Sequence, residues 1–287
     1  MSSLRDPLEA GAQAVLNIGA NLSALFLAIA LFWQVLVFRI LGLAPVYRPR
    51  DVLITGASSG IGAALAKSYA GSGNCTRLVL VARSVDRLEK VAAECRKLGV
   101  DVRVESVDSG DAESLRAVMK KYQNVDLVIA NAGMVMPETS GLDNTMDAAE
   151  EIVRVNVCGT FNTIAPIMDS MRRRRTGQVA IVSSIAGFFG HPSLTYYAAT
   201  KAALVAFSRG IRPVAAQDGI RFSCICPGLV DTPMAANLKG VPTWIAWMPE
   251  TAAETIRHGL ERDRPVIGFP KWQYFAVEMA RYCHGFR

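Results

Sequence analysis

Metal-binding patterns are missing from this chain of 287 residues, which has only three histidines and six cysteines. The cysteines form no C-x-x-C pair and no cluster with the histidines, so the sequence predicts no metal site. Cys224 and Cys226 fall on one face of an expected strand and are interpreted as small buried hydrophobic residues, not as ligands or a disulfide. Reduced thiols are consistent with a cytosolic location.

A strong excess of one charge is also missing, because the formal net charge is only +6. The one dense basic run, Arg172–Arg175, follows a helical stretch that ends near Met171. Basic residues at a helix end complement the helix dipole, which favours a solvated loop over a phosphate or lipid-headgroup patch. Nothing beyond this run indicates nucleic acid, and we expect no nucleic-acid partner.

Charged residues are absent from Ala10 to Phe38, and Leu22–Phe38 is almost wholly apolar. A membrane-spanning helix needs about 20 such residues. A cleaved signal peptide is the competing interpretation, but the run is too long and lacks a clean small-x-small cleavage site. A buried core helix is the other alternative. We predict that residues 1–45 form a membrane anchor.

The charges beside this run predict its orientation. Arg39, Arg48 and Arg50 follow it, whereas Arg5 on the other side is offset by two acids. The positive-inside rule then places the C-terminal domain in the cytosol, as a single-pass membrane protein. The endoplasmic reticulum is a plausible location if the source is eukaryotic.

Internal repeats and low-complexity linkers are absent too, which predicts one domain over residues 46–287. Strand-like and helical patterns alternate, and the strands are continuously apolar, as in a parallel sheet covered on both faces. The sequence therefore predicts an α/β, Rossmann-type, doubly wound parallel sheet. The expected strands are Val52–Thr55, Leu78–Val81, Val102–Val107, Leu127–Ala130, Val179–Ser183 and Phe222–Ile225. Helices are expected near 60–70, 86–98, 112–122, 148–171 and 196–217.

The first strand runs into a glycine-rich turn, Thr55–Gly62. Glycines allow unusual dihedral angles and let a pyrophosphate approach backbone N–H groups, and the following helix N-terminus favours the anion. The pattern predicts a dinucleotide site. The expected cofactor-binding residues of this turn are Gly56, Ser58, Ser59, Gly60, Ile61 and Gly62.

An acidic residue is missing at the end of the second strand, where one would bind the ribose hydroxyls of NAD. The segment Val81–Ser84 instead offers Arg83, which can bind a 2′-phosphate. A surface arginine is the alternative. We expect NADP(H) as cofactor, with NAD(H) less favoured.

Three residues suggest the chemistry. Tyr197 and Lys201 are four residues apart at the start of a helix, and Ser184 lies thirteen positions before the tyrosine, at the end of the fifth strand. An ammonium group near a phenol, together with an oxidised nicotinamide, lowers the phenol pKa towards the range useful for proton transfer. A serine hydroxyl can hold a substrate oxygen. The set predicts hydride transfer to or from a carbonyl.

With these motifs the chain resembles the short-chain dehydrogenase/reductase family, across residues 51–230. Thr55–Gly62 is similar to the family's TGxxxGxG motif, and Asn131-Ala132-Gly133 to its NAG motif. The remaining family positions are the catalytic tetrad of Asn156, Ser184, Tyr197 and Lys201, the adenine-contacting Asp108, and the nicotinamide-flanking Pro227, Gly228, Val230 and Thr232.

The resemblance implies a role for each tetrad member. Tyr197 would be the general acid in reduction and the base in oxidation, while Lys201 would bind the nicotinamide ribose and lower the tyrosine pKa. Ser184 would position the carbonyl, and Asn156 would hold a water in the proton relay. Tyr197 and Lys201 thus also contact cofactor. Spacing excludes the neighbouring Ser183 and Tyr196.

The family implies two further expectations. Ser59 occupies a place where some NADP-preferring members carry a basic residue, so the NADP preference depends on Arg83 alone. A homodimer or homotetramer would form through the helices that contain Asn156 and Tyr197.

The C-terminal part is expected to bind substrate. Met234–Pro249 has large apolar side chains that predict a lid for a hydrophobic substrate, with a locally packed helix as the alternative. These side chains are Trp244, Ile245, Trp247 and Met248. The aromatic, basic tail Phe269–Arg287 could lie at a membrane interface or pack on the domain or a partner chain.

Taken together, the sequence predicts an NADP(H)-dependent oxidoreductase that interconverts a carbonyl and a secondary or primary alcohol. A lipophilic small molecule, such as a keto-lipid, steroid or retinoid, is the expected substrate. A cofactor-binding membrane scaffold or redox sensor is the alternative function.

Overall fold

The computed structural model describes residues 23, 26, 27, 29, 33, 46–135, 146–190, 194–237 and 245–284. The chain divides into two units, Met1–Val46 and Tyr47–Arg287. The predicted membrane anchor at 1–45 lies almost entirely outside the described residues. Within the described part of the chain, no helix has the length and apolar character needed to cross a membrane.

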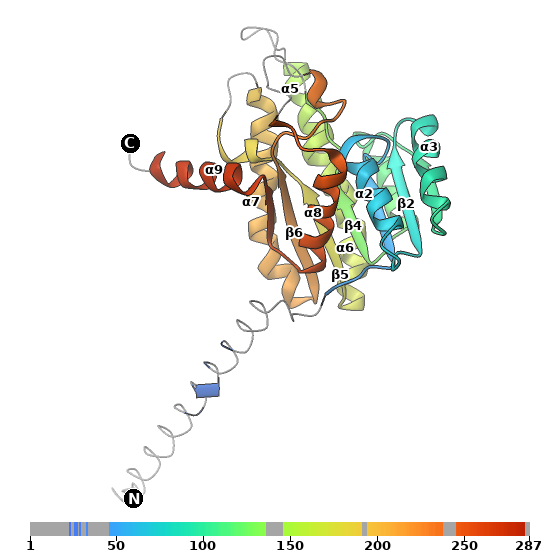
Figure 1. Ribbon diagram of the computed structural model, residues 1–287, viewed down its shortest axis with the longest axis horizontal. Coiled ribbons are helices and arrows are strands. Elements are labelled where there is room, and N and C mark those ends of the chain that lie inside the picture. Colours follow the sequence, from blue (N-terminus) through green and yellow to red (C-terminus); the bar gives the residue numbers. More distant parts are fainter. Residues whose placement is uncertain are drawn as a thin grey trace, which may run out of the picture. The chain divides into compact units, whose positions relative to one another are not determined.

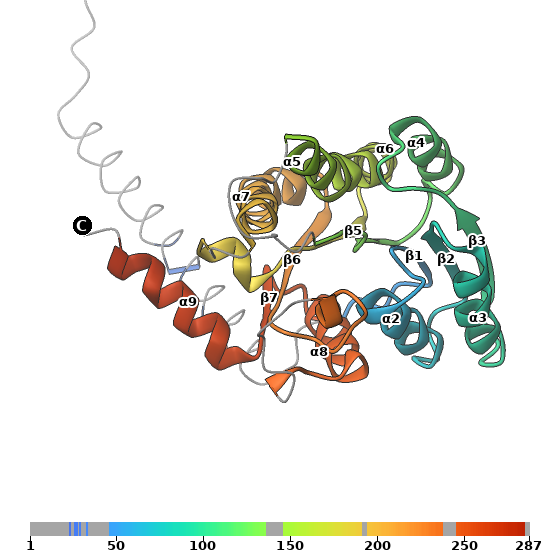
Figure 2. The ribbon, with the colours of Figure 1, turned by 90° about the horizontal axis from the view of Figure 1, so that it is seen from above.

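The second unit is built on a seven-stranded parallel sheet with the order β3-β2-β1-β4-β5-β6-β7 (Figures 1 and 2). The strands are β1 (Asp51–Thr55), β2 (Arg77–Ala82), β3 (Asp101–Ser106), β4 (Leu127–Ala130), β5 (Gly177–Val182), β6 (Ile220–Pro227) and β7 (Val266–Phe269). The order reverses direction between β1 and β4, which are neighbours although two strands separate them in sequence. Parallel α/β sheets bind ligands at the carboxyl edge beside such a reversal.

The predicted fold class is confirmed, and so are all six predicted strands. The seventh strand, β7, was not predicted. Its four residues follow the charged segment Glu261–Arg264, and so short an apolar run is a weak signal without its partner. Backbone pairing with β6 aligns Ile225 with Ile267 and makes it a strand.

Helices cover both faces of the sheet (Figure 2). One face carries α2 (Gly60–Ala70), α3 (Val85–Arg96) and α8 (Pro249–Glu261), and the other carries α4 (Ala112–Lys121), α6 (Gly159–Arg174) and α7 (Thr195–Gln217). A last helix, α9 (Lys271–His284), lies beyond β7. The strands read as continuous apolar runs because both of their faces are buried: every residue of β5 is buried.

The single helix expected near 148–171 consists of three consecutive segments. These are α5 (Met146–Val153), a π-helical turn η1 (Arg154–Cys158) and α6. Periodicity does not reveal a π-turn, which inserts one residue per turn and is frequent at functional sites. Here it contains Asn156.

The expectation of a solvated loop at Arg172–Arg175 is wrong, because most of this run is helical. Helix α6 continues to Arg174, and Arg175 ends it in the left-handed conformation with φ 52°. Arg174 donates to the backbone carbonyl of Val125 at 3.0 Å, and Arg172 pairs with Asp218 at 2.8 Å. The arginines therefore attach the C-terminal end of α6 to neighbouring segments, and the ion pair with Asp218 neutralises part of their charge.

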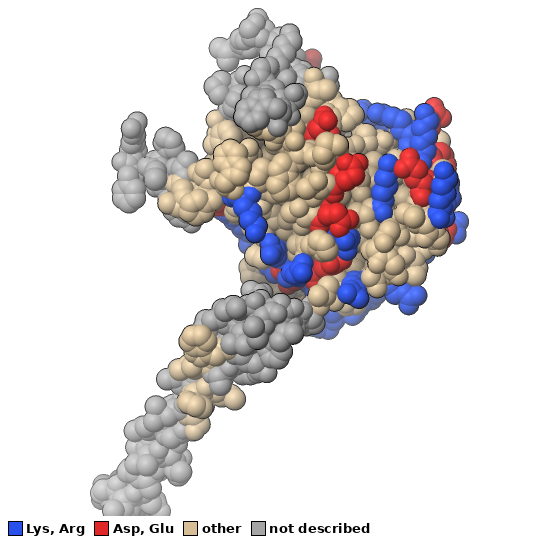
Figure 3. All heavy atoms as spheres, in the orientation of Figure 1, with Lys and Arg blue, Asp and Glu red and all other residues tan. Residues whose placement is uncertain are grey.

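Charges of both signs are interspersed on the face shown in Figure 3, over α2, α3 and α8. Ion pairs there include Lys67 with Glu94 at 2.7 Å and Arg257 with Glu261 at 2.6 Å. A nucleic-acid surface needs a basic stripe, and this face does not present one.

Candidate active site

The glycine turn between β1 and α2 is built by close backbone packing. Gly56 has φ +67°, and a side-chain carbon there would lie 2.8 Å from the amide nitrogen of Asn131. At Gly62 the same atom would lie 2.3 Å from the carbonyl oxygen of Gly56. Only glycine fits both positions, and the turn therefore packs closely before the N-terminus of α2, where a ligand phosphate can bind.

Asn131, at the end of β4, fixes this turn. Its side-chain amide donates to the carbonyl of Thr55 at 3.0 Å and to that of Gly56 at 3.2 Å. Its backbone N–H donates to the hydroxyl of Thr55 at 3.1 Å. The side-chain nitrogen is therefore used within the protein, and Asn131 shapes the site by holding β1 and β4 together.

A cavity of about 510 Å³ opens along the carboxyl edge of the sheet. All the site residues predicted from the sequence line it except Gly62 and Asn156, which lie behind its wall. The cavity continues from the glycine turn, past Asp108 and Gly133, to Ser184 and Tyr197. A dinucleotide site and a substrate site are thus parts of one cavity.

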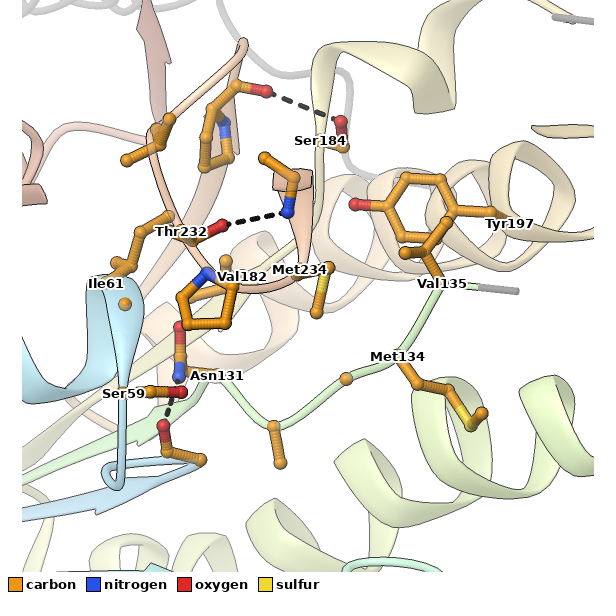
Figure 4. A pocket seen from close by; sticks show the side chains of 18 of the residues that line it. Ser59, Ile61, Asn131, Met134, Val135, Val182, Ser184, Tyr197, Thr232 and Met234 are labelled. Atoms are coloured by element: carbon orange, nitrogen blue, oxygen red, sulfur yellow. Dashed lines mark hydrogen bonds between the residues drawn. The ribbon is translucent and has the colours of Figure 1, made fainter. Parts of the chain in front are cut away.

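Ser184 and Tyr197 point into this cavity, Ser184 from the turn after β5 and Tyr197 from the first turn of α7 (Figure 4). Ser184 caps the short 3₁₀ helix η2 (Ile185–Phe188): its hydroxyl accepts from the N–H of Ala186 at 3.1 Å and donates to the carbonyl of Pro227 at 3.3 Å. Burial raises the pKa of Tyr197, while a hydrogen bond with Ser184 lowers it. The phenol therefore carries its proton at neutral pH in the ligand-free protein.

Lys201 lies one turn along α7 and is almost completely buried, with 4% of its surface exposed. Its ammonium group donates to the carbonyl of Val182 at 3.0 Å and lies 5.5 Å from the centre of the Tyr197 ring. Burial lowers the pKa of Lys201 to about 8, an effect that the nearby Cys224 and Cys226 partly oppose. The charged form of the lysine is thus less stable here than it is in water.

Asn156 is fully buried in the π-turn η1. Its side-chain oxygen accepts from the N–H of Met134 at 2.8 Å, and its nitrogen donates to the carbonyl of Met134 at 3.0 Å and to the hydroxyl of Thr200 at 3.1 Å. The side chain therefore joins η1 to the loop after β4 and to α7. Sequence reasoning missed Thr200, although it immediately precedes Lys201.

Two arginines lie at the other end of the cavity. Arg83, after β2, and Arg87, in the first turn of α3, are both exposed and both line it. Asp108 accepts from the N–H of Gly110 at 2.8 Å, which orders the loop after β3. Sequence reasoning missed Arg87; its signal was a second arginine four residues after the first.

Part of the cavity lining is apolar. It includes Val135, Phe189, Leu194 and Met234, of which only Met234 falls in the segment predicted to bind substrate. The other three come from loops after β4 and β5, which the spacing of motifs did not indicate.

The predicted lid residues divide among several roles. Trp247 is not part of the cavity lining, because it stacks on Phe269 with ring centroids 5.2 Å apart and pairs through its backbone with Val230. Met248 precedes α8 as its N-cap, and Trp244 lies outside the described residues. Local packing thus accounts for Trp247, the alternative left open above.

Known proteins resemble this chain in sequence. The family model described as short chain dehydrogenase matches residues 50–241. The 17-beta-hydroxysteroid dehydrogenase 13 of Rattus norvegicus is 35% identical over 233 residues, which cover 78% of this chain and 75% of that protein. The oxidoreductase UcpA of Salmonella typhimurium is 33% identical over 198 residues, 66% of this chain and 72% of that protein.

Solved structures match as well. A short-chain dehydrogenase from Sphingobium yanoikuyae in complex with NADPH has a TM-score of 0.72 and 26% identity, covering 82% of this chain and 94% of that one. An alcohol dehydrogenase from Thermococcus sibiricus complexed with 5-hydroxy-NADP has a TM-score of 0.68 and 32% identity, covering 77% and 94%.

Proposed function

The chain belongs to the short-chain dehydrogenase/reductase family, and on this premise we propose that it interconverts a carbonyl and an alcohol on a lipophilic substrate. It is an oxidoreductase acting on CH–OH and C=O groups with NADP(H). The observation that carries the proposal is the single cavity that Ser184 and Tyr197 line together with several apolar side chains.

The residues present fit NADP(H). The glycine turn lines the cavity at the start of α2, where a pyrophosphate would bind, and Arg83 with Arg87 would bind a 2′-phosphate by charge-assisted hydrogen bonds. NADPH and 5-hydroxy-NADP in the two solved relatives support this choice. When bound, the nicotinamide supplies or accepts the hydride.

The protein's own residues would move the proton. In reduction, Tyr197 gives its hydroxyl proton to the substrate oxygen, and in oxidation it takes the proton back. With substrate bound, the Ser184 hydroxyl would turn from the Pro227 carbonyl to donate to the same oxygen, where it would stabilise the developing charge. Lys201, protonated below about pH 8, favours the phenolate that Tyr197 becomes. Gly133 leaves the space beside Lys201 open, since a side-chain carbon there would lie 3.4 Å from the ammonium nitrogen.

A lipophilic substrate is supported by the apolar side chains that line the cavity together with Tyr197. Val135, Phe189, Leu194 and Met234 offer no hydrogen-bonding group, and apolar walls with a few polar groups are typical of sites for hydrophobic small molecules. The similarity to proteins named 17-beta-hydroxysteroid dehydrogenase 13 supports steroids or other lipids as the class to test first.

Membrane attachment is part of the proposal. The uncharged run Leu22–Phe38 would anchor the chain, with the catalytic domain in the cytosol. An anchor would raise the rate of encounter with membrane-dissolved substrate.

A homodimer or homotetramer would form through α5, α6 and α7. Exposed apolar side chains on these helices, Val153, Phe161 and Val214, support an interface there.

The test is NADPH oxidation by the detergent-solubilised full chain against keto-lipids, steroids, retinal and small ketones. We expect turnover on one lipid class and its loss in Tyr197→Phe. Faster turnover of water-soluble ketones than of every lipid would contradict the lipophilic part. A full panel without turnover, with NADPH still bound, would instead favour the scaffold alternative.

A further inference from the structure

Helix α9 has an inner face that is fixed to the domain. Tyr274 packs edge-on against Phe188 of η2, with ring centroids 5.5 Å apart, and its hydroxyl donates to Glu278 at 3.0 Å. Glu278 also pairs with Arg209 of α7. Figure 2 shows α9 beyond β7, at the edge of the sheet. These contacts determine which side chains of α9 turn outward.

The outer face of α9 is apolar, the reverse of the usual pattern for a surface helix. Trp272 is 67% exposed, Phe275 65% and Met279 47%, and the exposed Ala276 lies between them. The spacing i, i+3, i+7 aligns the three large side chains along one stripe. We call Trp272, Phe275, Ala276 and Met279 the α9 stripe.

The charged side chains of α9 also distinguish its inner face from its outer face. Among the side chains of α9 that the structure describes, the only acid is Glu278, which turns inward to Arg209 and Tyr274. Lys271, at the start of the helix, is exposed. The outer face therefore combines aromatic side chains with a cation and no carboxylate, the composition of helices that lie in a membrane interface.

We propose that the α9 stripe lies in the interface of a membrane, as a contact separate from the N-terminal segment. At about 150–250 Å² per aromatic side chain, Trp272 and Phe275 with Met279 offer a few hundred Å². A stable protein interface buries about 800 Å² per partner, so the stripe is too small to hold a second copy alone. Insertion of two aromatic side chains among lipid headgroups has no such minimum area.

The inner face of helix α9 lies near one end of the cavity. Phe188, which packs on Tyr274, is followed directly by Phe189, which lines the cavity and is 41% exposed. A membrane contact through α9 would bring this rim of the cavity towards lipid. The inference goes beyond the proposed function and does not depend on it, because lipid contact can be measured without turnover.

Tryptophan quenching by brominated lipids tests the contact. The full chain, with four tryptophans, is reconstituted into vesicles of phosphatidylcholine and phosphatidylglycerol with and without brominated acyl chains. The emission of Trp272 is the difference between the natural chain and Trp272→Phe. We expect more than half of that emission to be lost in brominated vesicles. Trp247→Phe is the matched control, because Trp247 stacks on Phe269, and its removal should leave the bromine-dependent loss unchanged.

Trp272 emission that is equal in both kinds of vesicle overturns the proposal. Phe275→Asp then identifies the other occupant: a fall in the mass of the detergent-solubilised protein, measured by light scattering, assigns the α9 stripe to a second copy. The substituted side chains of α9 are exposed, so we expect these variants to fold. NADPH binding by each variant checks that the domain is folded.

Discussion

The ammonium group of Lys201 lies 5.5 Å from the centre of the Tyr197 ring, and the same group donates to the carbonyl of Val182. One turn of α7 brings the phenol and the ammonium together, and β5 fixes the ammonium. The lysine is buried with 4% of its surface exposed. Water therefore screens the ammonium charge little at this position.

Replacing Tyr197 should abolish the reaction without unfolding the protein. Tyr197→Phe removes only the hydroxyl that would transfer the proton, and general acid–base catalysis contributes about 10²–10⁴-fold. We expect kcat to fall by about that factor, with the Kd for NADPH nearly unchanged. Tyr196→Phe is the matched control, because the neighbouring Tyr196 is exposed and not part of the cavity lining. Equal losses in the two variants would contradict the assignment.

Replacing Arg83 or Arg87 should weaken NADPH binding but not NADH binding. A hydrogen bond to a charged group contributes about 1.5–3 kcal/mol, so Arg83→Ala and Arg87→Ala should each raise the KM for NADPH by roughly 10–100-fold. Arg103→Ala is the control, since Arg103 is exposed on β3 and pairs with Asp101 at 3.1 Å. If NADH and NADPH were affected equally, these arginines would not bind the 2′-phosphate.

Lys201 should make the folded state more stable as the pH rises. Its pKa is lowered to about 8 in the folded protein, against about 10.4 when unfolded, so between these values the unfolded state binds more protons and stability increases with pH. The cost of the buried charge is fully present below pH 8 and is lost above pH 10.4. At pH 7, Lys201→Met should lack activity but gain stability, on the order of 3 kcal/mol.

Thermal unfolding measures this effect. The difference in Tm between Lys201→Met and the natural chain should shrink between pH 7 and pH 10. A difference in Tm that is constant over this range would mean that the pKa of Lys201 is the same in the folded and unfolded states.

Thr200 should stabilise the site through Asn156. Thr200→Val removes the hydroxyl that accepts from the Asn156 amide at 3.1 Å, and a buried donor left without a partner costs about 1–3 kcal/mol. Thr200→Ser keeps the hydroxyl and is the matched control. Urea unfolding should separate the two variants, and equal midpoints would show that the amide finds another acceptor.

Gly62 should not tolerate a side chain. Gly62→Ala would place a carbon 2.3 Å from the backbone oxygen of Gly56, so we expect loss of NADPH binding measured by cofactor fluorescence. Gly210→Ala is the control, since Gly210 is exposed on α7 with nothing within 4 Å of its added carbon. That variant should be more stable by about 0.5–1 kcal/mol and should bind NADPH normally.

The sequence by itself determined the layered fold and most of the site. Buried parallel strands are continuously apolar, and Gly62 is required by a backbone contact with Gly56 six residues earlier, so both leave local signals. The pair Tyr197 and Lys201 is local too, because one helical turn brings its members together. These features depend on short-range geometry, which spacing along the chain records.

Only the tertiary structure decided the features that depend on contacts between distant segments. Arg87, Thr200 and Phe189 reach the cavity or its wall because crossover connections bring loops after different strands to one sheet edge. Trp247 belongs to local packing because Phe269, on the unpredicted strand β7, lies beside it. The direction of the α9 stripe is likewise set by Phe188 and Arg209. Residue type alone cannot show which face of a helix a distant segment will cover.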